Sequence, residues 1–421
     1  MTTNTSILNV SHRKTIPLIA GFVRPGFEAV REAFAENFIQ RGELGAAACM
    51  YYQGEKVVDL WGGVRNKATG EPWEEDTMVI VHSTTKGMAG MAMALANSHG
   101  WLDYEEKVCT YWPEFAQNGK EKVTVRHLLS HQAGLLALDG TVNKEVASDL
   151  DRLAVVLAQQ KPAWEPGTRQ GYHGISLGFY ENELMRRVDP NHRSIGRFFQ
   201  EEIATPLGLE FYIRLPETMP NARLAKLEMF NPLNRLVHTK PGLLLASLNP
   251  RSLTFRAMFV NPGVGLPFDK ERIYSRELEV PSQGGVGTAR AIARAYSSFA
   301  TGGIELGLRN ETLQALMAPG TPPKFGFFDE CLKITWPLSL GFMKPCPLYP
   351  IGSPAAFGTP GAGGSFGFAD PQKGIGYAYV TNQMGVKQGK DPRELALRDA
   401  LYQSIGSLTP FQPGDDKINN N

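Results

Sequence analysis

Residues 78–98 read MVIVHSTTKGMAGMAMALANS, and this segment joins a strand-like run to a helical pattern. Apolar residues fill positions 78–81 and then recur at helical spacing until Gly100 ends the pattern. Ser83 and Lys86 lie three residues apart at the junction, so they project from the same face of the first helical turn. Unpaired backbone N–H groups at a helix start favour developing negative charge. An activated serine nucleophile requires such an arrangement.

The S-x-x-K pattern of Ser83 and Lys86 also has structural interpretations. A second match at residues 11–14 lies in a polar terminus without a preceding strand, so the pattern alone is weak. A serine at a helix start is commonly an N-cap, and a helical lysine is commonly solvated. Residues 87–96, which follow Lys86, are almost wholly apolar, and this argues against a solvated lysine.

Outward from this segment, strands are predicted near both chain ends and helices between them. Helical spacing predicts helices at 26–41, 84–98, 125–131, 149–160, 175–188, 195–203 and 289–300. Apolar runs bounded by turn residues predict strands at 46–52, 56–61, 78–81, 366–369 and 375–381. A sheet built from both ends of the chain, with a helical lobe inserted between them, covers these elements in layers. The expected fold class is therefore α+β.

The composition is that of a folded protein with a large core, because 42% of the 421 residues are hydrophobic and 20% are charged. Lys and Arg number 43 and Asp and Glu number 42, which gives a net charge of +1. No general attraction to nucleic acid or to an anionic membrane follows from this balance. No stretch approaches the roughly 20 apolar residues that span a bilayer. We therefore expect a small-molecule substrate.

Four cysteines, Cys49, Cys109, Cys331 and Cys346, are spread along the chain without a C-x-x-C pair. Such spacing favours free thiols in a reducing cytosol over a disulfide framework or a zinc site. The apolar run at 16–23 has no small-residue cleavage site after it, so we expect no export signal. These features predict a cytoplasmic protein.

Five segments together resemble motifs of one known superfamily. They are VDLWGG at 58–63, STTK at 83–86, LLSHQAGL at 128–135, WEPG at 164–167 and GTPGAGGSFG at 358–367. In this order they resemble the serine β-lactamase-related superfamily of class C β-lactamases, D,D-peptidases and family VIII carboxylesterases. The similarity is greatest to the esterase-like branch. It implies a β-lactamase/transpeptidase-like fold, in which helices flank an antiparallel sheet and a helical lobe is inserted.

The resemblance also implies a set of catalytic groups. Ser83 would be the nucleophile, Lys86 its partner and Tyr172 the third member of the site. A lysine kept neutral by desolvation, or a tyrosine kept anionic by a nearby cation, can take the serine proton, and we assign the two jointly. The backbone N–H groups of Ser83 and Ala362 would form the oxyanion hole.

The sequence departs from the superfamily pattern at two positions. Thr359 stands where the third motif normally has Lys or His, ahead of Gly361, and a threonine cannot pair with a substrate carboxylate. His173 and Gly174 follow Tyr172 where the lactamase pattern Tyr-x-Asn has its amide, so His173 is either a structural loop residue or a group near the leaving group. Both departures favour ester cleavage over lactam cleavage.

Other residues are candidates for substrate binding or for rival chemistry. Trp336 and Phe357 are candidates to line an acyl pocket. The segment 363–367 matches the G-x-S-x-G nucleophile elbow, but two predicted strands follow Ser365 where the elbow needs a helix. His127 and His131 have the spacing of zinc ligands but lack the glutamate of H-E-x-x-H, so we expect neither a metal nor a cofactor.

One active site is expected to span most of the chain, because Ser83 and Ala362 belong to it together. It would lie at the interface of two interleaved lobes. The expected units are a sheet lobe of residues 1–85 with 280–410, a mainly helical lobe of 86–279 and a flexible tail of 411–421.

The predicted function is that of a serine hydrolase that cleaves small, short-acyl carboxylic esters through an acyl-enzyme on Ser83, with weak β-lactamase activity as a side reaction. The same chemistry leaves a β-lactamase, a D-aminopeptidase or D,D-peptidase, or an acyltransferase as alternatives. A catalytically inactive binding or scaffold protein is the alternative from another class, because a fold does not imply an activity.

Overall fold

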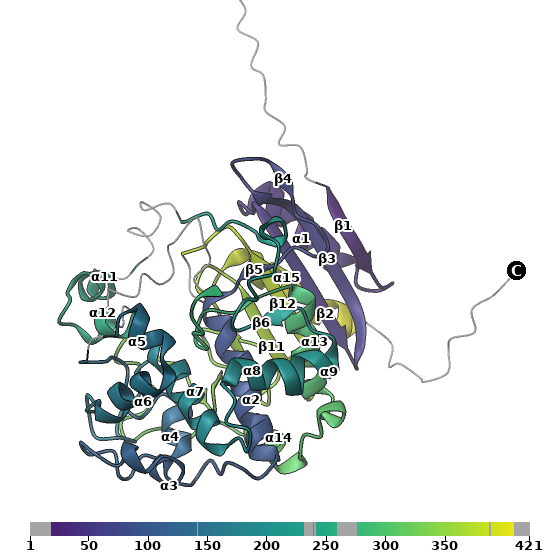
Figure 1. Cartoon of the computed structure of the whole chain (residues 1–421). Coiled ribbons are helices and arrows are strands. Elements are labelled where there is room, and N and C mark those ends of the chain that lie inside the picture. The colour runs from purple at the N-terminus through teal and green to yellow at the C-terminus, as the bar shows by residue number, and fades with distance from the viewer. Residues whose placement is uncertain are drawn as a thin grey trace, which may run out of the picture.

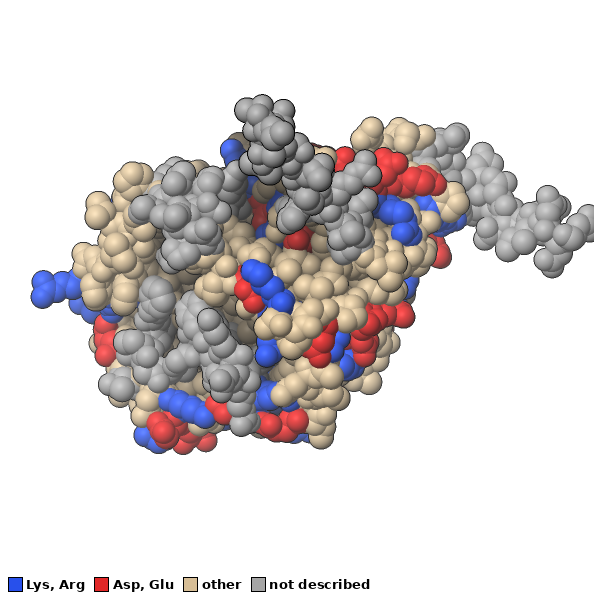
Figure 2. All heavy atoms as spheres, turned by 90° about the horizontal axis from the view of Figure 1, so that it is seen from above, with Lys and Arg blue, Asp and Glu red and all other residues tan. Residues whose placement is uncertain are grey.

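The computed structural model describes residues 18–140, 142–230, 239, 241–258, 276–386 and 389–407. The tail predicted at 411–421 lies outside these residues. Among the described helices, none is both long and apolar enough to cross a membrane. Figure 2 shows one face of the molecule, on which acidic and basic side chains are interspersed rather than gathered by charge.

Strands from both chain ends form one antiparallel sheet, as the fold class predicted. Its order is β1-β3-β2-β12-β11-β10-β9-β8, with β4 paired to β3. The early and late halves of the chain meet where β2 pairs with β12, from Ala46 opposite Thr381 to Tyr52 opposite Ile375 (Figure 1). The strands are β1 (Ile19–Val23), β2 (Gly45–Tyr52), β3 (Glu55–Asn66), β4 (Glu71–Pro72), β8 (Leu338–Ser339), β9 (Phe342–Met343), β10 (Phe357–Pro360), β11 (Phe366–Asp370) and β12 (Ile375–Thr381).

Helices cover both faces of this sheet. α1 (Glu28–Gln40) and α15 (Pro392–Ser407) pack against each other on one face, and α13 (Ala289–Ala300) contacts β2, β11 and β12 on the other. Alternate residues of β2 enter the two cores, because successive side chains of a strand point to opposite faces. Ala48 and Met50 join the core that contains α1, and Cys49 joins the core that contains α13.

The helix α2 (Thr85–Ser98) is central to the helical part, and nearly all its residues are buried. Its small residues allow close packing: a Cβ atom on Gly90 would lie 3.0 Å from the Phe342 ring. Other described helices are α3 (Val108–Tyr111), α4 (Val125–Leu129), α5 (Lys144–Ser148), α6 (Leu150–Gln159), α7 (Ser176–Val188), α8 (Ile195–Phe199), α9 (Thr205–Leu207), α11 (Pro241–Leu248), α12 (Leu253–Met258) and α14 (Asn310–Met317).

A small second sheet precedes the helix α2. It consists of β5 (Val79–Ile80), β7 (Val286–Gly287) and β6 (Phe211–Tyr212), in the order β5-β7-β6. The predicted strand at 78–81 is therefore real but only two residues long. This strand pairs the chain just ahead of Ser83 with residues more than 100 positions later in the sequence.

Most predicted elements occur within two residues of their expected bounds, but the strand expected at 56–61 extends to Asn66 as β3, and one helix also differs. The helix expected at 195–203 is α-helical only to Phe199, because Gln200–Ala204 form a π-helical turn. Several elements were not predicted, among them the strand β1 and the helix α15. β1 pairs with β3, and α15 packs on α1, so tertiary contacts support both. The lobe boundaries at 85/86 and 279/280 stay a prediction.

Candidate active site

Ser83 lies in a short 3-10 turn (His82–Thr84) between β5 and α2. His82 has a φ of 47°, in the left-handed region that non-glycine residues rarely adopt. Such strained backbone is concentrated at functional sites. The turn leaves Ser83 on the wall of a cavity of about 90 Å³.

The side chain of Lys86 is buried beside this serine. Its Nζ lies 3.3 Å from Ser83 Oγ, 2.7 Å from the Gly174 carbonyl oxygen and 2.9 Å from the Ser282 carbonyl oxygen. Burial lowers the pKa of Lys86 to about 7, and the charge of Glu181 acts in the opposite direction. A neutral amine has two N–H bonds and one lone pair. The two carbonyl oxygens accept hydrogen bonds from the two N–H groups, so the lone pair of the amine is available toward Ser83.

Tyr172 closes the other side of the nucleophile. Its hydroxyl hydrogen-bonds to Ser83, and its ring centroid is 4.7 Å from Lys86 Nζ. Burial raises the pKa of Tyr172, and the hydrogen bond with Ser83 opposes this rise only in part. The phenol is therefore protonated at neutral pH, and it can donate a proton or a hydrogen bond.

The backbone around Ala362, just after β10, packs closely against the 3-10 turn that contains Ser83. A Cβ atom on Gly361 would lie 2.3 Å from the Val81 carbonyl oxygen, so only glycine fits there. The Gly361 N–H donates to the Ser365 carbonyl oxygen at 2.7 Å, and Thr84 Oγ1 donates to the same oxygen at 3.2 Å. Ala362 consequently lines the same cavity as Ser83.

Aromatic side chains form the remaining wall of the cavity. Trp336 stacks on Tyr349 with ring centroids 5.9 Å apart and lies 5.4 Å from the ring of Tyr172. Its Nε1 donates to Asp329 at 2.9 Å, and the same carboxylate accepts the Tyr172 backbone N–H at 3.1 Å. Asp329 therefore connects Trp336, on the cavity wall, to the backbone of Tyr172. Phe366 also lines the cavity.

A profile of the Beta-lactamase family matches residues 28–401. The chain belongs to this family. It is 32% identical over 372 residues to the esterase/beta-lactamase LipL of Mycobacterium tuberculosis, which covers 87% of this chain and 83% of LipL.

Solved structures agree with the family assignment. A family VIII carboxylesterase superposes with a TM-score of 0.81 at 35% identity, covering 92% of this chain and 100% of that one. A penicillin-binding protein homologue from Caulobacter crescentus superposes with a TM-score of 0.76 at 34% identity, covering 92% of this chain and 100% of the homologue. The protein is accordingly a serine hydrolase with the β-lactamase fold, as the sequence motifs predicted.

Three residues expected to contact substrate do not line the cavity in this Beta-lactamase family protein. Thr359 is buried, and its hydroxyl accepts a hydrogen bond of 3.4 Å from Tyr296. Because neighbouring strand residues point to opposite sides, Pro360 lines the cavity and Thr359 does not. Phe357 packs in the core with its ring 5.0 Å from that of Phe342.

His173, the third of these residues, organises the loop after His131. Its Nε2 accepts the Leu135 N–H at 2.9 Å, its Nδ1 contacts the Gly171 carbonyl oxygen, and its own N–H donates to His131 Nδ1 at 2.9 Å. Burial lowers the pKa of His173 to about 4, so the ring is neutral. These contacts correspond to the structural interpretation of His173.

The rival motifs have other structural roles in this family member. Two strands, β11 and β12, follow Ser365, and an elbow would need a helix there. His127 accepts the Thr124 N–H in a capping box at the start of α4. Within the described ranges, no group of three or more His, Cys, Asp or Glu side chains is arranged to hold a metal ion.

Several site residues carry no signal that sequence analysis found. Asp329 has no motif around it, and the carbonyl groups of Gly174 and Ser282 contribute backbone atoms only. Leu332 and Met258 line the cavity from segments with no recognisable pattern. Only the long-range packing identifies these five residues as neighbours of Ser83.

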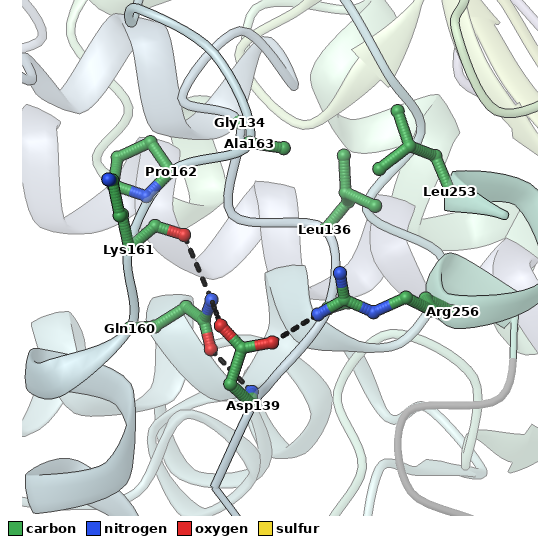
Figure 3. A pocket seen from close by; sticks show the side chains of 10 residues that line it. Gly134, Leu136, Asp139, Gln160, Lys161, Pro162, Ala163, Leu253 and Arg256 are labelled. Carbon is green, nitrogen blue, oxygen red and sulfur yellow. Dashed lines mark hydrogen bonds and ion pairs between the residues drawn. The ribbon is translucent and has the colours of Figure 1, made fainter. Parts of the chain in front are cut away.

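A second cavity of about 160 Å³ lies beside the helix α12 and contains none of the predicted catalytic residues (Figure 3). Asp139 forms an ion pair there with Arg256, and Gln160 Nε2 donates a hydrogen bond to the Asp139 carboxylate at 2.9 Å (Figure 3). Leu253 and Arg256 of α12 line this cavity, while Met258 at the end of α12 lines the cavity of Ser83.

Proposed function

We propose that this protein is a carboxylesterase that hydrolyses small esters with short acyl chains through an acyl-enzyme on Ser83. The contact between Lys86 Nζ and Ser83 Oγ is the observation that carries the proposal. Two carbonyl oxygens accept hydrogen bonds from both N–H groups of the neutral amine, so its lone pair is free to accept the serine proton.

Acylation then follows from this geometry. The Ser83 oxygen attacks the ester carbonyl carbon as its proton passes to Lys86, and the carbonyl oxygen becomes an oxyanion held by the backbone N–H groups of Ser83 and Ala362. The ester C–O bond breaks as Tyr172 donates its proton to the departing alkoxide. Lys86 returns a proton to Tyr172, which restores both groups.

Deacylation repeats these steps with water. Lys86 accepts a proton from the water molecule that attacks the acyl carbon. The tetrahedral intermediate then releases a carboxylic acid and Ser83, and the Ser83 oxygen takes back the proton that Lys86 had accepted. We assign the base role to Lys86, because burial lowers the pKa of Lys86 to about 7 but raises the pKa of Tyr172. A phenol with a raised pKa is a poor base and a suitable proton donor near neutral pH.

The cavity favours a short acyl group. Its volume of about 90 Å³ is small for a binding site, and the aromatic side chains of Trp336, Tyr349 and Phe366 line it. Thr359 lies behind the wall and Pro360 stands in front, so neither side chain of this strand offers a cation to the carboxylate of a lactam or peptide substrate. These features support ester hydrolysis over the lactamase and peptidase alternatives, with slow lactam hydrolysis as a side activity.

The test is a series of p-nitrophenyl esters from acetate to octanoate together with a fluorophosphonate probe. Wild-type protein is expected to turn over the short esters fastest and to carry one phosphonyl group on Ser83, located by mass spectrometry. Ser83→Ala should lose both the ester turnover and the phosphonyl label. Ser365→Ala, which changes a serine on the same cavity wall, should keep the label on Ser83. Ester turnover undiminished in Ser83→Ala would refute the proposal, and an unlabelled wild type would favour the inactive-scaffold alternative.

An added alcohol distinguishes a hydrolase from an acyltransferase. A hydrolase forms mainly the free acid, whereas a transferase diverts most of the acyl-enzyme into a new ester. We also propose a cytoplasmic location, which is supported by the fact that all four cysteines are free thiols.

A further inference from the structure

The cavity of Ser83 is lined by two acidic side chains for which the proposed mechanism has no role. Asp391 lies just before α15 and Glu394 lies in its first turn, and both line the cavity. Both are buried, with 7% and 6% of their surface exposed. A buried carboxyl group is costly unless it is paired, so each of the two requires an explanation.

The carboxylate of Asp391 is fully paired. Its Oδ1 accepts hydrogen bonds from the backbone N–H and from Nε of Arg393, each at 3.0 Å. Its Oδ2 accepts a hydrogen bond of 2.7 Å from Arg393 Nη2. The pairing with Arg393 accounts for the burial of Asp391 and leaves neither of its oxygens without a partner.

Glu394 differs from Asp391, because only half of its carboxyl group is paired. Its Oε2 accepts a hydrogen bond of 3.2 Å from Arg398 Nη2, whereas its Oε1 has no hydrogen-bond partner among the described residues. The Tyr377 hydroxyl is a further neighbour of Glu394, but its hydrogen bond of 3.4 Å goes to the backbone oxygen. A residue of the cavity wall therefore carries a buried carboxyl oxygen that can still accept a hydrogen bond.

Tyr349 provides a second unused polar group on the same wall. It lines the cavity and is 6% exposed, and its hydroxyl forms no hydrogen bond with any residue that the structure describes. Its ring centroid lies 6.3 Å from that of Phe366, and the guanidinium of Arg398, the partner of Glu394, lies 5.9 Å from the same centroid. Both groups therefore border Phe366. Burial raises the pKa of Tyr349, so its hydroxyl stays protonated and can donate.

The charges around Glu394 favour a neutral ligand over a cation. Arg398 is fixed beside the carboxyl group of Glu394, and Arg393 is fixed beside that of Asp391. Each acidic side chain of the wall already has a positive partner, and an ammonium group would be repelled by both guanidinium groups. A hydroxyl group can both donate and accept hydrogen bonds. It can donate to Glu394 Oε1 while it accepts from the Tyr349 hydroxyl.

We propose that Glu394 and Tyr349 form a hydroxyl-binding subsite of the Ser83 cavity, and that the preferred substrates are short esters that carry a hydroxyl group. This inference rests on the proposed esterase function, because it names a substrate class for that site. The two side chains contact a part of the substrate that does not react, so they determine specificity. A pocket built to bind a hydroxyl group discriminates against the analogue that lacks it, because the polar atoms of the pocket are then left unpaired.

The test measures kcat/KM at pH 8 for ethyl butyrate, ethyl 3-hydroxybutyrate and 2-hydroxyethyl butyrate. The hydroxyl group lies on the acyl half of the second ester and on the alcohol half of the third, so the pair shows which half the subsite binds. Burial raises the pKa of Glu394 to about 7, so Glu394 is a carboxylate at pH 8. For one hydroxylated ester, kcat/KM should exceed that for ethyl butyrate by about tenfold or more.

Tyr349→Phe and Glu394→Gln each remove one partner of the substrate hydroxyl. Tyr349→Phe keeps the ring. In Glu394→Gln the amide oxygen would face Arg398, so an NH₂ group that cannot accept a hydrogen bond would replace Oε1. In both variants the ratio of kcat/KM for the preferred hydroxylated ester to that for ethyl butyrate should fall about tenfold. The ratio cancels any general loss of activity, which is all that a merely structural role would produce. Tyr349→Phe carries the comparison if Glu394→Gln does not fold.

Tyr402→Phe is the matched control on α15. The Tyr402 hydroxyl donates to Asp370 Oδ2 at 2.9 Å, and Tyr402 does not line the cavity. This variant should lower Tm and leave the ratio of the two kcat/KM values unchanged. A cationic analogue, ethyl 3-aminobutyrate, provides the control for charge, and a preference for it over both hydroxylated esters would overturn the assignment of a neutral hydroxyl ligand.

Labelling of Ser83 separates failure of the subsite from failure of the proposed function. If wild type prefers neither hydroxylated ester, or if a folded Tyr349→Phe or Glu394→Gln variant keeps the wild-type ratio, while the fluorophosphonate still labels Ser83, the hydroxyl subsite is wrong and the proposed esterase function stands. If Ser83 is not labelled in wild type, the proposed function itself has failed.

Discussion

Gly87 of α2 lies against Tyr296 of α13, and a Cβ atom on Gly87 would be 2.1 Å from the Tyr296 hydroxyl oxygen. The same Cβ atom would be 3.0 Å from Thr359 Oγ1. The helix α2, which carries Lys86 and follows the turn of Ser83, is therefore packed on α13 and β10 at a position with no room for a side chain. The distance between Lys86 Nζ and Ser83 Oγ depends on how deeply α2 sits there.

Gly87→Ala is expected to push α2 away from α13. Overpacking of this kind costs about 1–3 kcal/mol, so Tm should fall, and kcat should fall more than KM rises because Ser83 and Lys86 move with the helix. Thermal unfolding and ester kinetics measure the two effects. The double variant Gly87→Ala/Tyr296→Phe removes the clashing oxygen and should recover part of both. No recovery would mean that the clash lies elsewhere.

The rate of ester hydrolysis should fall as the pH drops through about 7. Only the neutral amine of Lys86 has a lone pair for the serine proton, and burial lowers the pKa of Lys86 to about 7. The acidic limb of kcat/KM against pH measures this. A limb with its midpoint at the usual carboxyl pKa, near 4, would contradict a base role for Lys86.

Lys86→Met should abolish turnover and stabilise the fold in a pH-dependent manner. The pKa of Lys86 is lower in the folded state than its usual value of 10.5 in the unfolded chain, so between about pH 7 and 10.5 the unfolded chain binds more protons and wild-type stability rises with pH. Methionine removes this dependence. The gain in Tm over wild type should be larger at pH 6 than at pH 9, and an equal gain at both would show that Lys86 is not desolvated.

Asp329→Asn should loosen Tyr172 and Trp336 together. One oxygen of Asp329 accepts the backbone N–H groups of Tyr172, Cys331 and Leu332, and the other accepts Trp336 Nε1. An amide NH₂ would face one of these donors, at a cost of about 1–3 kcal/mol. We expect a lower Tm and a lower kcat. Tryptophan fluorescence that does not change would argue that Trp336 keeps its place without this bond.

Leu332→Ala should shift the substrate preference toward longer acyl chains. Leu332 lines the catalytic cavity, and its truncation deepens the pocket. The ratio of kcat/KM for hexanoate to that for acetate should rise. Leu316→Ala is the control, because Leu316 is buried in α14 and does not line the cavity. It should lose about 2–5 kcal/mol of stability with an unchanged ratio.

Much of the fold was predictable because its signals are local. The glycine-terminated helical pattern of 84–98 and the continuous apolar run of β2 are each contained in a short stretch of sequence, so they can be recognised from neighbouring residues alone. The strand β1 was missed, since its residues form a strand by pairing with β3 rather than by their own pattern. The helix α15 was missed in the same way, because its contacts with α1 are distant in the sequence.

The substrate-facing residues were harder to predict, because the direction of a side chain depends on strand register and packing. The motif aligned Thr359 with a substrate-binding position, but the pleat of β10 turns Thr359 toward Tyr296 and leaves Pro360 on the cavity. His173 likewise holds a loop rather than lining the described cavity. Trp336, chosen only as an aromatic residue, does line it.

The sequence by itself determined the spacing of Ser83 and Lys86 at the start of a helix, because helical geometry is local and three residues bring two side chains to one face. The tertiary structure decided the chemical state of that lysine. Carbonyl groups 88 and 196 residues away accept hydrogen bonds from its amine, and Glu181 is its acidic neighbour. Burial and charge are sums over everything nearby in space, so no short stretch of sequence contains them.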